Sequence, residues 1–427
     1  MTGLPLLLSL QWAGTAQANI PGTNDHFISG NPATFTAVAS YVSRYPRAFA
    51  GVWVNEGRHT LNVGVTSDAS GKIVAGIDRV AQAKSRPVAG NQWSLNFVRS
   101  GHSLSSLGRT MRSVTTAQPW ATLSARYLSV WYVDNRADRV VVGLTRITPS
   151  LRRAAMASLG RSVKLALIER PAMLTYRRTF KTPPRIVHVS ASRVRPATCS
   201  RVLDCTPYWG GDRLIWWNST TVDECTQAFP WTPSGHGNTF DVSATAGHCG
   251  PTNRTWHQGY YNASNHTIYY TGIAGTTNLR SWGNNLADGE TLSNADMTII
   301  VYDESSISGP GATIGSYAQP VQGQTVCADG SFTYQNCSGT VQTVDTCVNV
   351  SDGGTTVHVC HLAYATSSSR LAQAGDSGGP VYEYTSHGSP PVVKLNGLIS
   401  AGNSSGTQLY FSNMNGLKSA LNGHPTT

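Results

Sequence analysis

The sequence predicts a chain of two unlike parts, an α/β region of two small lobes over residues 19–190 and an all-β domain over residues 191–427. The two parts also differ in net charge. Residues 1–195 hold 25 Lys and Arg against 7 Asp and Glu, whereas the remaining residues hold 7 Lys and Arg against 15 Asp and Glu. All eight cysteines lie at or after Cys199. Beyond about residue 196, short β-rich runs between turn residues predict an antiparallel sandwich or a pair of barrels.

The amino terminus has the pattern of a secretory signal peptide. An apolar run, Leu4–Leu10, ends in Ala16-Gln17-Ala18, which predicts removal of residues 1–18 and cleavage before Asn19. The run is too short to span a bilayer, and no other segment is apolar for the roughly 18–20 residues that a span needs. We therefore expect a secreted, extracellular protein without a membrane span.

Two hairpins in the α/β region resemble each other in sequence. Val52-Trp53-Val54 with Val63–Thr66 matches Val130-Trp131-Tyr132 with Val142–Thr145. A helical pattern precedes each hairpin, at Thr34–Ala50 and Ser103–Val114, and a helix and a strand are predicted at Ser150–Val163 and Lys164–Ile168. These matches indicate two tandem lobes. Chance similarity is the alternative, because any strand selects β-branched residues.

A basic, proline-containing stretch, Lys181-Thr182-Pro183-Pro184-Arg185, lies near the end of this region. Its weak periodicity predicts a linker and a candidate region for proteolytic release. The net charges of the two parts, +18 and −8, predict that the acidic partner of the basic part is the rest of its own chain.

The cysteine pattern predicts a disulfide framework in an oxidising compartment, because an even number is confined to one segment. A zinc site is the alternative, but there is no Cys-x2-Cys pair, and Cys249 follows His248 directly. We expect no metal and no cofactor.

A nucleophile is predicted in Gly375-Asp376-Ser377-Gly378-Gly379-Pro380. The flanking glycines allow a tight turn in which the N–H groups of Gly375 and Ser377 converge on one oxygen, as an oxyanion hole requires. The alternative for this hexapeptide is an ordinary surface turn.

The candidate base is His248, which follows a turn of small residues and precedes a cysteine that could fix that turn. The candidate orienting carboxylate is Asp296, at the start of the apolar run Met297–Ile300, with Asp288 and Asp303 as alternatives. A buried carboxylate needs a partner, and the imidazole N–H would supply one.

The order His248, Asp296, Ser377 and the surrounding motifs resemble the S1 (chymotrypsin-like) serine peptidases, most closely their secreted bacterial branch of streptogrisin and α-lytic protease. The resemblance covers roughly the last 220 residues and rests on these segments: Gly210-Gly211-Asp212, Cys225, Asn294-Ala295-Asp296, Val326-Cys327 with Cys337, Gly375–Pro380 and Ser400-Ala401-Gly402. It implies a double six-stranded barrel and a long amino-terminal pro-region that assists folding and inhibits the mature enzyme.

The resemblance also implies residue roles and cysteine pairs. Ser377 would be the nucleophile, His248 the general base and then acid, and Asp296 the group that fixes the imidazole tautomer. Cys225 with Cys249 would staple the His248 loop, and Cys327 with Cys337 matches a bridge of the bacterial branch. By elimination, the remaining cysteines would pair as Cys347 with Cys360 and Cys199 with Cys205.

Two departures from the family concern the site. Trypsins place the acid that binds Lys or Arg side chains six residues before the nucleophile, and this chain has Leu371 there, so that a substrate pocket at Leu371, Ala372, Ser400 and Gly402 is expected to take apolar residues. Relatives place a basic partner for the aspartate before the nucleophile just after Cys327. Here Ala328-Asp329 follows, which leaves the partner of Asp376 open.

These features together predict a secreted, monomeric serine endopeptidase made as a zymogen. It would act on polypeptide substrates and bind its own pro-region before activation. One alternative is a chymotrypsin-fold binding protein without activity, which usually lacks a triad member. Another is a lasting polyanion-binding role for the basic half, which lacks the clustered basic and aromatic residues of a nucleic-acid groove.

Overall fold

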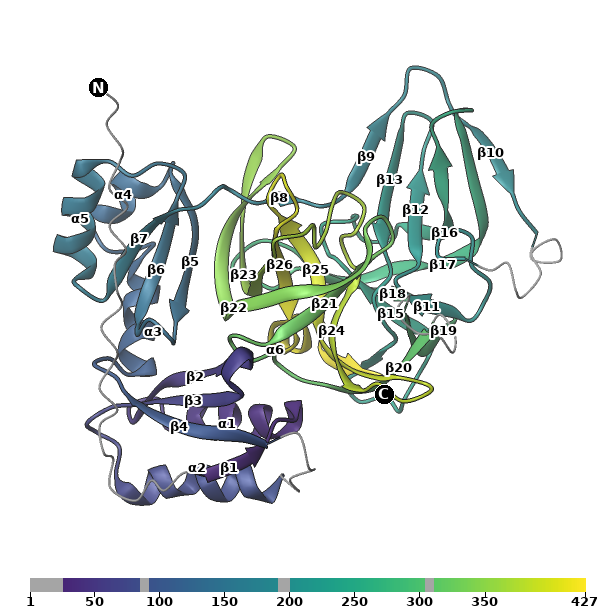
Figure 1. Cartoon of the computed structure of the whole chain (residues 1–427). Coiled ribbons are helices and arrows are strands. Elements are labelled where there is room, and N and C mark those ends of the chain that lie inside the picture. The colour runs from purple at the N-terminus through teal and green to yellow at the C-terminus, as the bar shows by residue number, and fades with distance from the viewer. Residues whose placement is uncertain (1–25, 85–91, 191–199, 304–310) are drawn as a thin grey trace, which may run out of the picture.

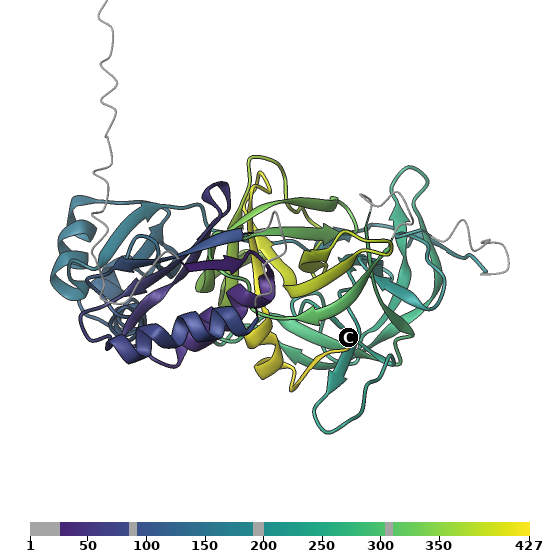
Figure 2. The ribbon, with the colours of Figure 1, turned by 60° about the horizontal axis from the view of Figure 1, so that its bottom comes forward.

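The computed structural model describes residues 26–84, 92–190, 200–303 and 311–427 (Figure 1). The predicted signal peptide and Cys199 lie outside these ranges. Two α/β lobes lie beside a larger β-rich body, as Figures 1 and 2 show. Within the described ranges, every helix is too short or too polar to traverse a bilayer.

The first lobe is a four-stranded sheet with two helices, and its strand order is β1-β4-β3-β2. Val38 and Ile77 from the helices pack in one core with Phe49 from the sheet. Strands β3 and β4 are parallel, and helix α2 connects them. The elements are β1 (His26–Ser29), α1 (Pro32–Ser43), β2 (Phe49–Asn55), a 3-10 turn (Glu56–Arg58), β3 (Thr60–Val65), α2 (Gly71–Ala83) and β4 (Gln92–Arg99).

The second lobe repeats the hairpin, helix and parallel strand of the first. Its β5-β6 hairpin is followed by α5 and by β7, which is parallel to β6, just as the β2-β3 hairpin is followed by α2 and β4. The two predicted hairpins are confirmed, and their shared connections support the interpretation of an internal duplication. The elements are α3 (Leu104–Ser113), α4 (Trp120–Ser124), β5 (Leu128–Asp134), β6 (Arg139–Leu144), α5 (Pro149–Leu159) and β7 (Val163–Leu167).

The first barrel of the β-rich body has six strands in the order β15-β18-β17-β16-β12-β13. The ring closes where Ala228 N donates to the Ala244 carbonyl at 2.8 Å and Ala244 N donates to the Phe229 carbonyl at 2.9 Å. Its strands are β12 (Arg213–Trp217), β13 (Thr221–Thr226), β15 (Val242–Thr245), β16 (Thr255–Asn262), β17 (Thr267–Ser281) and β18 (Gly289–Ser293).

The second barrel is a closed ring of six strands in the order β21-β22-β23-β26-β25-β24, in which β24 pairs again with β21. Its strands are β21 (Thr325–Gly330), β22 (Tyr334–Asp352), β23 (Thr355–Thr366), β24 (Pro380–Ser386), β25 (Val392–Gly402) and β26 (Gln408–Asn413). The predicted double six-stranded barrel is thereby confirmed. Further elements are β11 (Tyr208–Gly210), β14 (Trp231–Pro233), β19 (Met297–Tyr302), β20 (Gly311–Tyr317), α6 (Met414–Ala420) and β27 (Gly423–Pro425).

Both lobes dock on the second barrel. Strand β5 extends the barrel sheet by pairing antiparallel with β22, where Trp131 lies opposite Cys347. Gln322 contacts both lobes, because its carbonyl accepts from Val54 N at 2.8 Å and its side-chain amide donates to Asp134 at 2.8 Å. Sheet pairing and polar contacts therefore join the basic region to the barrels.

The segment that leaves the lobes crosses both barrels (Figure 1). Strand β8 (Ala172–Met173) pairs antiparallel with β25 of the second barrel, and β9 (Tyr176–Thr179) pairs antiparallel with β13 of the first. Strand β10 (Arg185–His188) then runs parallel to β17. The predicted linker at residues 181–185 leads from β9 into β10.

Three predicted disulfides are confirmed: Cys225–Cys249, Cys327–Cys337 and Cys347–Cys360. The pairing of Cys205 with Cys199 stays a prediction, because Cys199 lies outside the described residues.

Candidate active site

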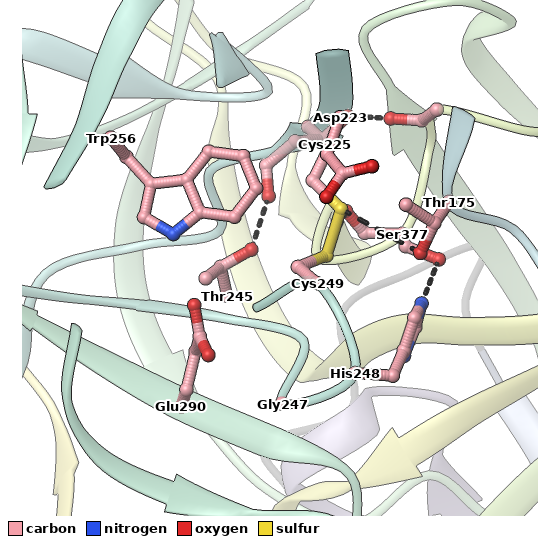
Figure 3. The surroundings of a disulfide bond; sticks show 12 residues. Thr175, Asp223, Cys225, Thr245, Gly247, His248, Cys249, Trp256, Glu290 and Ser377 are labelled. Atoms are coloured by element: carbon pink, nitrogen blue, oxygen red, sulfur yellow. Dashed lines mark hydrogen bonds between the residues drawn. A yellow bond between two sulfur atoms is a disulfide. The ribbon is translucent and has the colours of Figure 1, made fainter. Parts of the chain in front are cut away.

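Ser377, His248 and Asp288 form a continuous chain of hydrogen bonds between the two barrels. Nε2 of His248 lies 2.7 Å from the Ser377 hydroxyl, and Nδ1 lies 2.6 Å from Oδ2 of Asp288. All three residues are buried, with Ser377 and Asp288 at 0 % exposure and His248 at 8 %. Figure 3 shows the imidazole directed at the Ser377 hydroxyl.

The His248 ring is held by the turn that follows β15. A Cβ on Gly247 would lie 2.2 Å from the Ser281 carbonyl oxygen, so only glycine fits before the histidine. The next residue, Cys249, is bonded to Cys225 of β13 (Figure 3). The glycine and the disulfide therefore constrain the turn that carries the imidazole.

Asp296 does not orient the imidazole, and this expectation is corrected. The Asp296 side chain is exposed, and its backbone carbonyl accepts from Tyr208 N at 2.7 Å. The reason is strand pairing: Thr245 lies opposite Glu290 in the β15–β18 pair, so the residue before β18, Asp288, lies next to the turn after β15. Asp296 precedes β19, which pairs with β20 and β11 instead.

Two further donors reach the Asp288 carboxylate, and the Asp288 main chain makes a hydrogen bond of its own. Oδ1 accepts from His248 N at 3.0 Å, and Oδ2 accepts from the Ser400 hydroxyl at 2.6 Å. Asp288 N donates to Ser412 Oγ at 3.0 Å. A fully buried carboxylate is stable only with such donors, so the ring and the hydroxyl of Ser400 together hold it in place. The sequence placed Ser400 in the substrate pocket but did not indicate this contact.

The hydrogen bonds to the Asp376 carboxylate come from the β21–β22 turn and from Gln373. The carboxylate accepts from Phe332 N at 2.7 Å, from Thr333 N at 3.1 Å, from the Thr333 hydroxyl at 2.5 Å and from Gln373 N at 2.7 Å. Burial raises the pKa of Asp376, and these hydrogen bonds oppose the rise. The network fixes the loop in front of Ser377.

The candidate oxyanion donor Gly375 is already engaged by the chain itself. Gly375 has a φ of +101°, a conformation that favours glycine, and its N–H donates to the Leu174 carbonyl. Leu174 directly follows β8, and Thr175 separates it from β9. A main-chain carbonyl from the segment that follows the lobes therefore lies at the predicted oxyanion donor, in the loop that carries Ser377.

The chain on both sides of Leu174 is bound as an extended strand. Before it, Met173 pairs with Ala401 and Ala172 with Gly402 of β25. After it, Tyr176 pairs with Glu224 and continues along β13. The peptide bond from Leu174 to Thr175 thus lies between the two barrels, and Figure 3 draws Thr175 near Ser377 and the Cys225–Cys249 disulfide.

The Leu174 side chain fills the predicted substrate pocket. It is 6 % exposed and belongs to one buried apolar cluster with Leu371, Ala372 and Ile399. A Cβ on Gly402 would lie 3.4 Å from a Leu174 methyl group, so this glycine forms the wall next to the leucine. Ser400 is fully buried beside them and its carbonyl accepts from the Ser377 hydroxyl at 3.3 Å.

A hollow of about 500 Å³ lies alongside this bound segment. His248 and Arg280 line it from the first barrel, and Met173, Thr175 and Arg177 line it from the segment that crosses the barrels. His248 and Thr175 therefore border the same open space.

Three comparisons with known proteins were made, and only the comparison with solved structures found similar chains. A scan against protein-family models found no match, and neither did a search of curated proteins. About half of the chain is similar in fold to bacterial chymotrypsin-like serine proteases.

A Nocardiopsis protease is 23% identical, with 51% of this chain and 98% of that chain covered and a TM-score of 0.38. Protease A of Thermobifida fusca is 21% identical, with the same coverages and a TM-score of 0.37. A Cellulomonas bogoriensis chymotrypsin is 22% identical over 51% of this chain and 98% of its own, with a TM-score of 0.36.

Proposed function

We propose that this protein is a secreted serine endopeptidase, made as a zymogen, in which Ser377 is the nucleophile. The observation that carries the proposal is the chain of hydrogen bonds from the Ser377 hydroxyl through His248 to Asp288. Serine needs an adjacent base to react at neutral pH, and the base needs a third group to fix its tautomer. The disulfides are compatible with an extracellular location.

In the proposed reaction, the Ser377 oxygen attacks the carbonyl carbon of the peptide bond while Nε2 of His248 takes the hydroxyl proton. The carbonyl oxygen becomes an oxyanion, which the N–H groups of Gly375 and Ser377 stabilise. The carbon–nitrogen bond then breaks, and His248 passes its proton to the departing amine. Water, deprotonated through the same imidazole, hydrolyses the acyl ester and restores the serine.

Asp288 has a positioning role in this proposal. Its carboxylate holds Nδ1–H of His248, so that Nε2 faces Ser377 and the imidazolium is stabilised as it forms. The hydroxyl of Ser400 supports the same carboxylate from the opposite barrel.

We further propose that the first bond cut is Leu174–Thr175 in the protein's own chain. Three contacts support this: the Leu174 carbonyl accepts from Gly375, the Leu174 side chain packs in the apolar pocket, and the flanking residues pair with β25 and β13. The region from residue 19 to Leu174 would then act as the inhibitory pro-region until the products separate. Six residues, 175–180, separate this bond from the linker that the sequence favoured for release.

The proposed preference is for an apolar residue before the cleaved bond. Burying the Leu174 side chain among Leu371 and Ala372 is favourable, whereas a charged side chain there would have no partner in that cluster.

Hydrolysis of peptide anilides tests the function. The processed protein should cleave a leucyl anilide much faster than arginyl or glutamyl anilides, and a serine-directed phosphonate should label Ser377. Ser377→Ala should lower kcat/KM by at least ~10³-fold. Undiminished cleavage by Ser377→Ala would contradict the role of Ser377 as nucleophile. A clear preference of the wild type for arginine would contradict the apolar pocket.

A further inference from the structure

The chain that follows the Leu174 carbonyl lies in a fixed register on the first barrel. Thr175 is the first residue after the proposed cleaved bond, Tyr176 lies opposite Glu224, and Arg177 lies opposite Asp223 of β13. Antiparallel pairing of this kind fixes which side chain meets which. The third residue after the bond therefore faces Asp223, whatever chain occupies this groove.

Asp223 presents a buried carboxylate to that third residue. It is 1 % exposed, and Nε and Nη2 of Arg177 donate to its Oδ1 and Oδ2 at 2.6 and 3.1 Å. Two parallel hydrogen bonds of this type match the planar guanidinium and not the single ammonium of lysine.

The other partner of Asp223 is held independently of β9. Nη1 of Arg254 donates to Oδ2 at 2.8 Å and to the Cys249 carbonyl at 3.0 Å, and its guanidinium lies 3.8 Å from the centre of the Trp216 ring. Arg254 thus keeps the carboxylate in place, while Oδ1 still faces the groove. Figure 3 shows Asp223 close to Cys225, on the strand that leads to the disulfide.

Arg177 lies on an edge strand, and its side chain is not part of a core. Its side chain is 53 % exposed, and β9 is the last strand of its sheet. An edge strand of this kind adds to a sheet through main-chain bonds, with specificity supplied by side-chain pockets.

We propose that Asp223 forms the subsite for the third residue after the cleaved bond and that this subsite selects arginine. The proposal rests on the proposed function of Ser377. In the intact chain Arg177 fills the subsite. After the Leu174–Thr175 bond is cut, residues 175–179 remain tethered to β10 and compete with substrates at a high effective concentration.

The test compares Arg177→Ala with the matched control Arg178→Ala in the processed protein. Arg178 lies on the same strand, but its guanidinium lies over the rings of Tyr176 and Tyr261. Each variant is given internally quenched peptides with leucine before the cleaved bond and Thr-Tyr-Xaa after it, where Xaa is Arg, Lys, Ala or Glu. Values of kcat/KM are divided by that for a leucyl anilide, which has no residue on β13.

With Arg177→Ala we expect the arginine peptide to be cleaved about tenfold better than the alanine peptide, because two charge-assisted hydrogen bonds form to Asp223. Lysine should rank below arginine, and glutamate should rank last. The wild type and Arg178→Ala should discriminate less, because Arg177 still occupies the subsite. Asp223→Asn added to Arg177→Ala should reduce the arginine preference to about twofold or less, with anilide cleavage reporting that the double variant is folded.

Equal cleavage of the arginine and alanine peptides by Arg177→Ala, with the anilide still cleaved, overturns the subsite while leaving the proposed function intact. This comparison tests the arginine subsite even if the double variant does not fold. Absence of anilide cleavage in the wild type instead overturns the proposed function and the subsite together.

Discussion

The backbone N–H of Gly375 donates a hydrogen bond to the carbonyl of Leu174. These residues are 201 positions apart, and the contact joins the segment that leaves the α/β lobes to the loop that carries Ser377. The Leu174 side chain is buried in the same apolar cluster as Leu371 and Ala372, so this segment reaches the loop of Ser377 through both its main chain and its side chain.

Replacement of Asp288 and of Asp296 tests which of the two carboxylates orients His248. Asp288→Asn should lower kcat for a leucyl anilide by roughly 10³–10⁴-fold, because the amide no longer fixes the productive tautomer of His248. Asp296→Asn is the matched control and should stay within about twofold, since the Asp296 side chain is exposed. Steady-state kinetics of both variants decide between the two residues, and a large loss in Asp296→Asn alone would reverse the assignment.

Replacement of Leu174 tests the apolar pocket on the chain itself. Leu174→Glu should slow cutting of the 174–175 bond at least ~100-fold, because a carboxylate would be buried among apolar side chains without a partner. Leu174→Met should be cut at close to the wild-type rate. Leu167→Glu is a control for the added charge, since Leu167 is 70% exposed. Mass spectrometry over time gives the rates, and cutting of Leu174→Glu at the wild-type rate and position would contradict the pocket assignment.

Glu224 predicts a specific pH dependence of stability. Burial raises the pKa of Glu224 from 4.5 to about 7, although Arg213 opposes this rise. The unfolded chain binds fewer protons at this site between those values, so the contribution of Glu224 to stability is greatest below about pH 4.5 and is lost as the pH rises to about 7.

Glu224→Gln should therefore stabilise the protein more at pH 8 than at pH 5, by about 2 kcal/mol. Urea unfolding in the Ser377→Ala background, which avoids self-digestion, measures the difference. The exposed carboxylate of Asp68 provides the control Asp68→Asn. An equal effect of Glu224→Gln at both pH values would show that Glu224 does not titrate in this range.

The sequence predicted features that local chemistry determines. The hairpins of both lobes follow from alternating β-branched residues, and the turn at His248 follows from Gly247 and Cys249. The Gly375–Pro380 loop was likewise recognisable, because its glycines are needed at specific backbone conformations.

Features that depend on pairing between distant strands were not predictable in the same way. Asp288 and Asp296 each precede a short strand, and only the pairing of β18 with β15 distinguishes them. The four donors to Asp376 come mostly from a turn at residues 332–333, which no spacing rule identifies. Nothing in the run Ala172–Thr175 indicated that Leu174 reaches the cleft, because its neighbours there come from residues about two hundred positions away.

The central claim is that Ser377 cuts the chain that occupies its own cleft. Amino-terminal sequencing and intact mass of the purified wild type and Ser377→Ala proteins test it most directly. We predict a new amino terminus at Thr175 in the wild type and no cut at this bond in Ser377→Ala. A wild-type chain that begins only beyond Arg185, or a cut before Thr175 that persists in purified Ser377→Ala, would contradict the account.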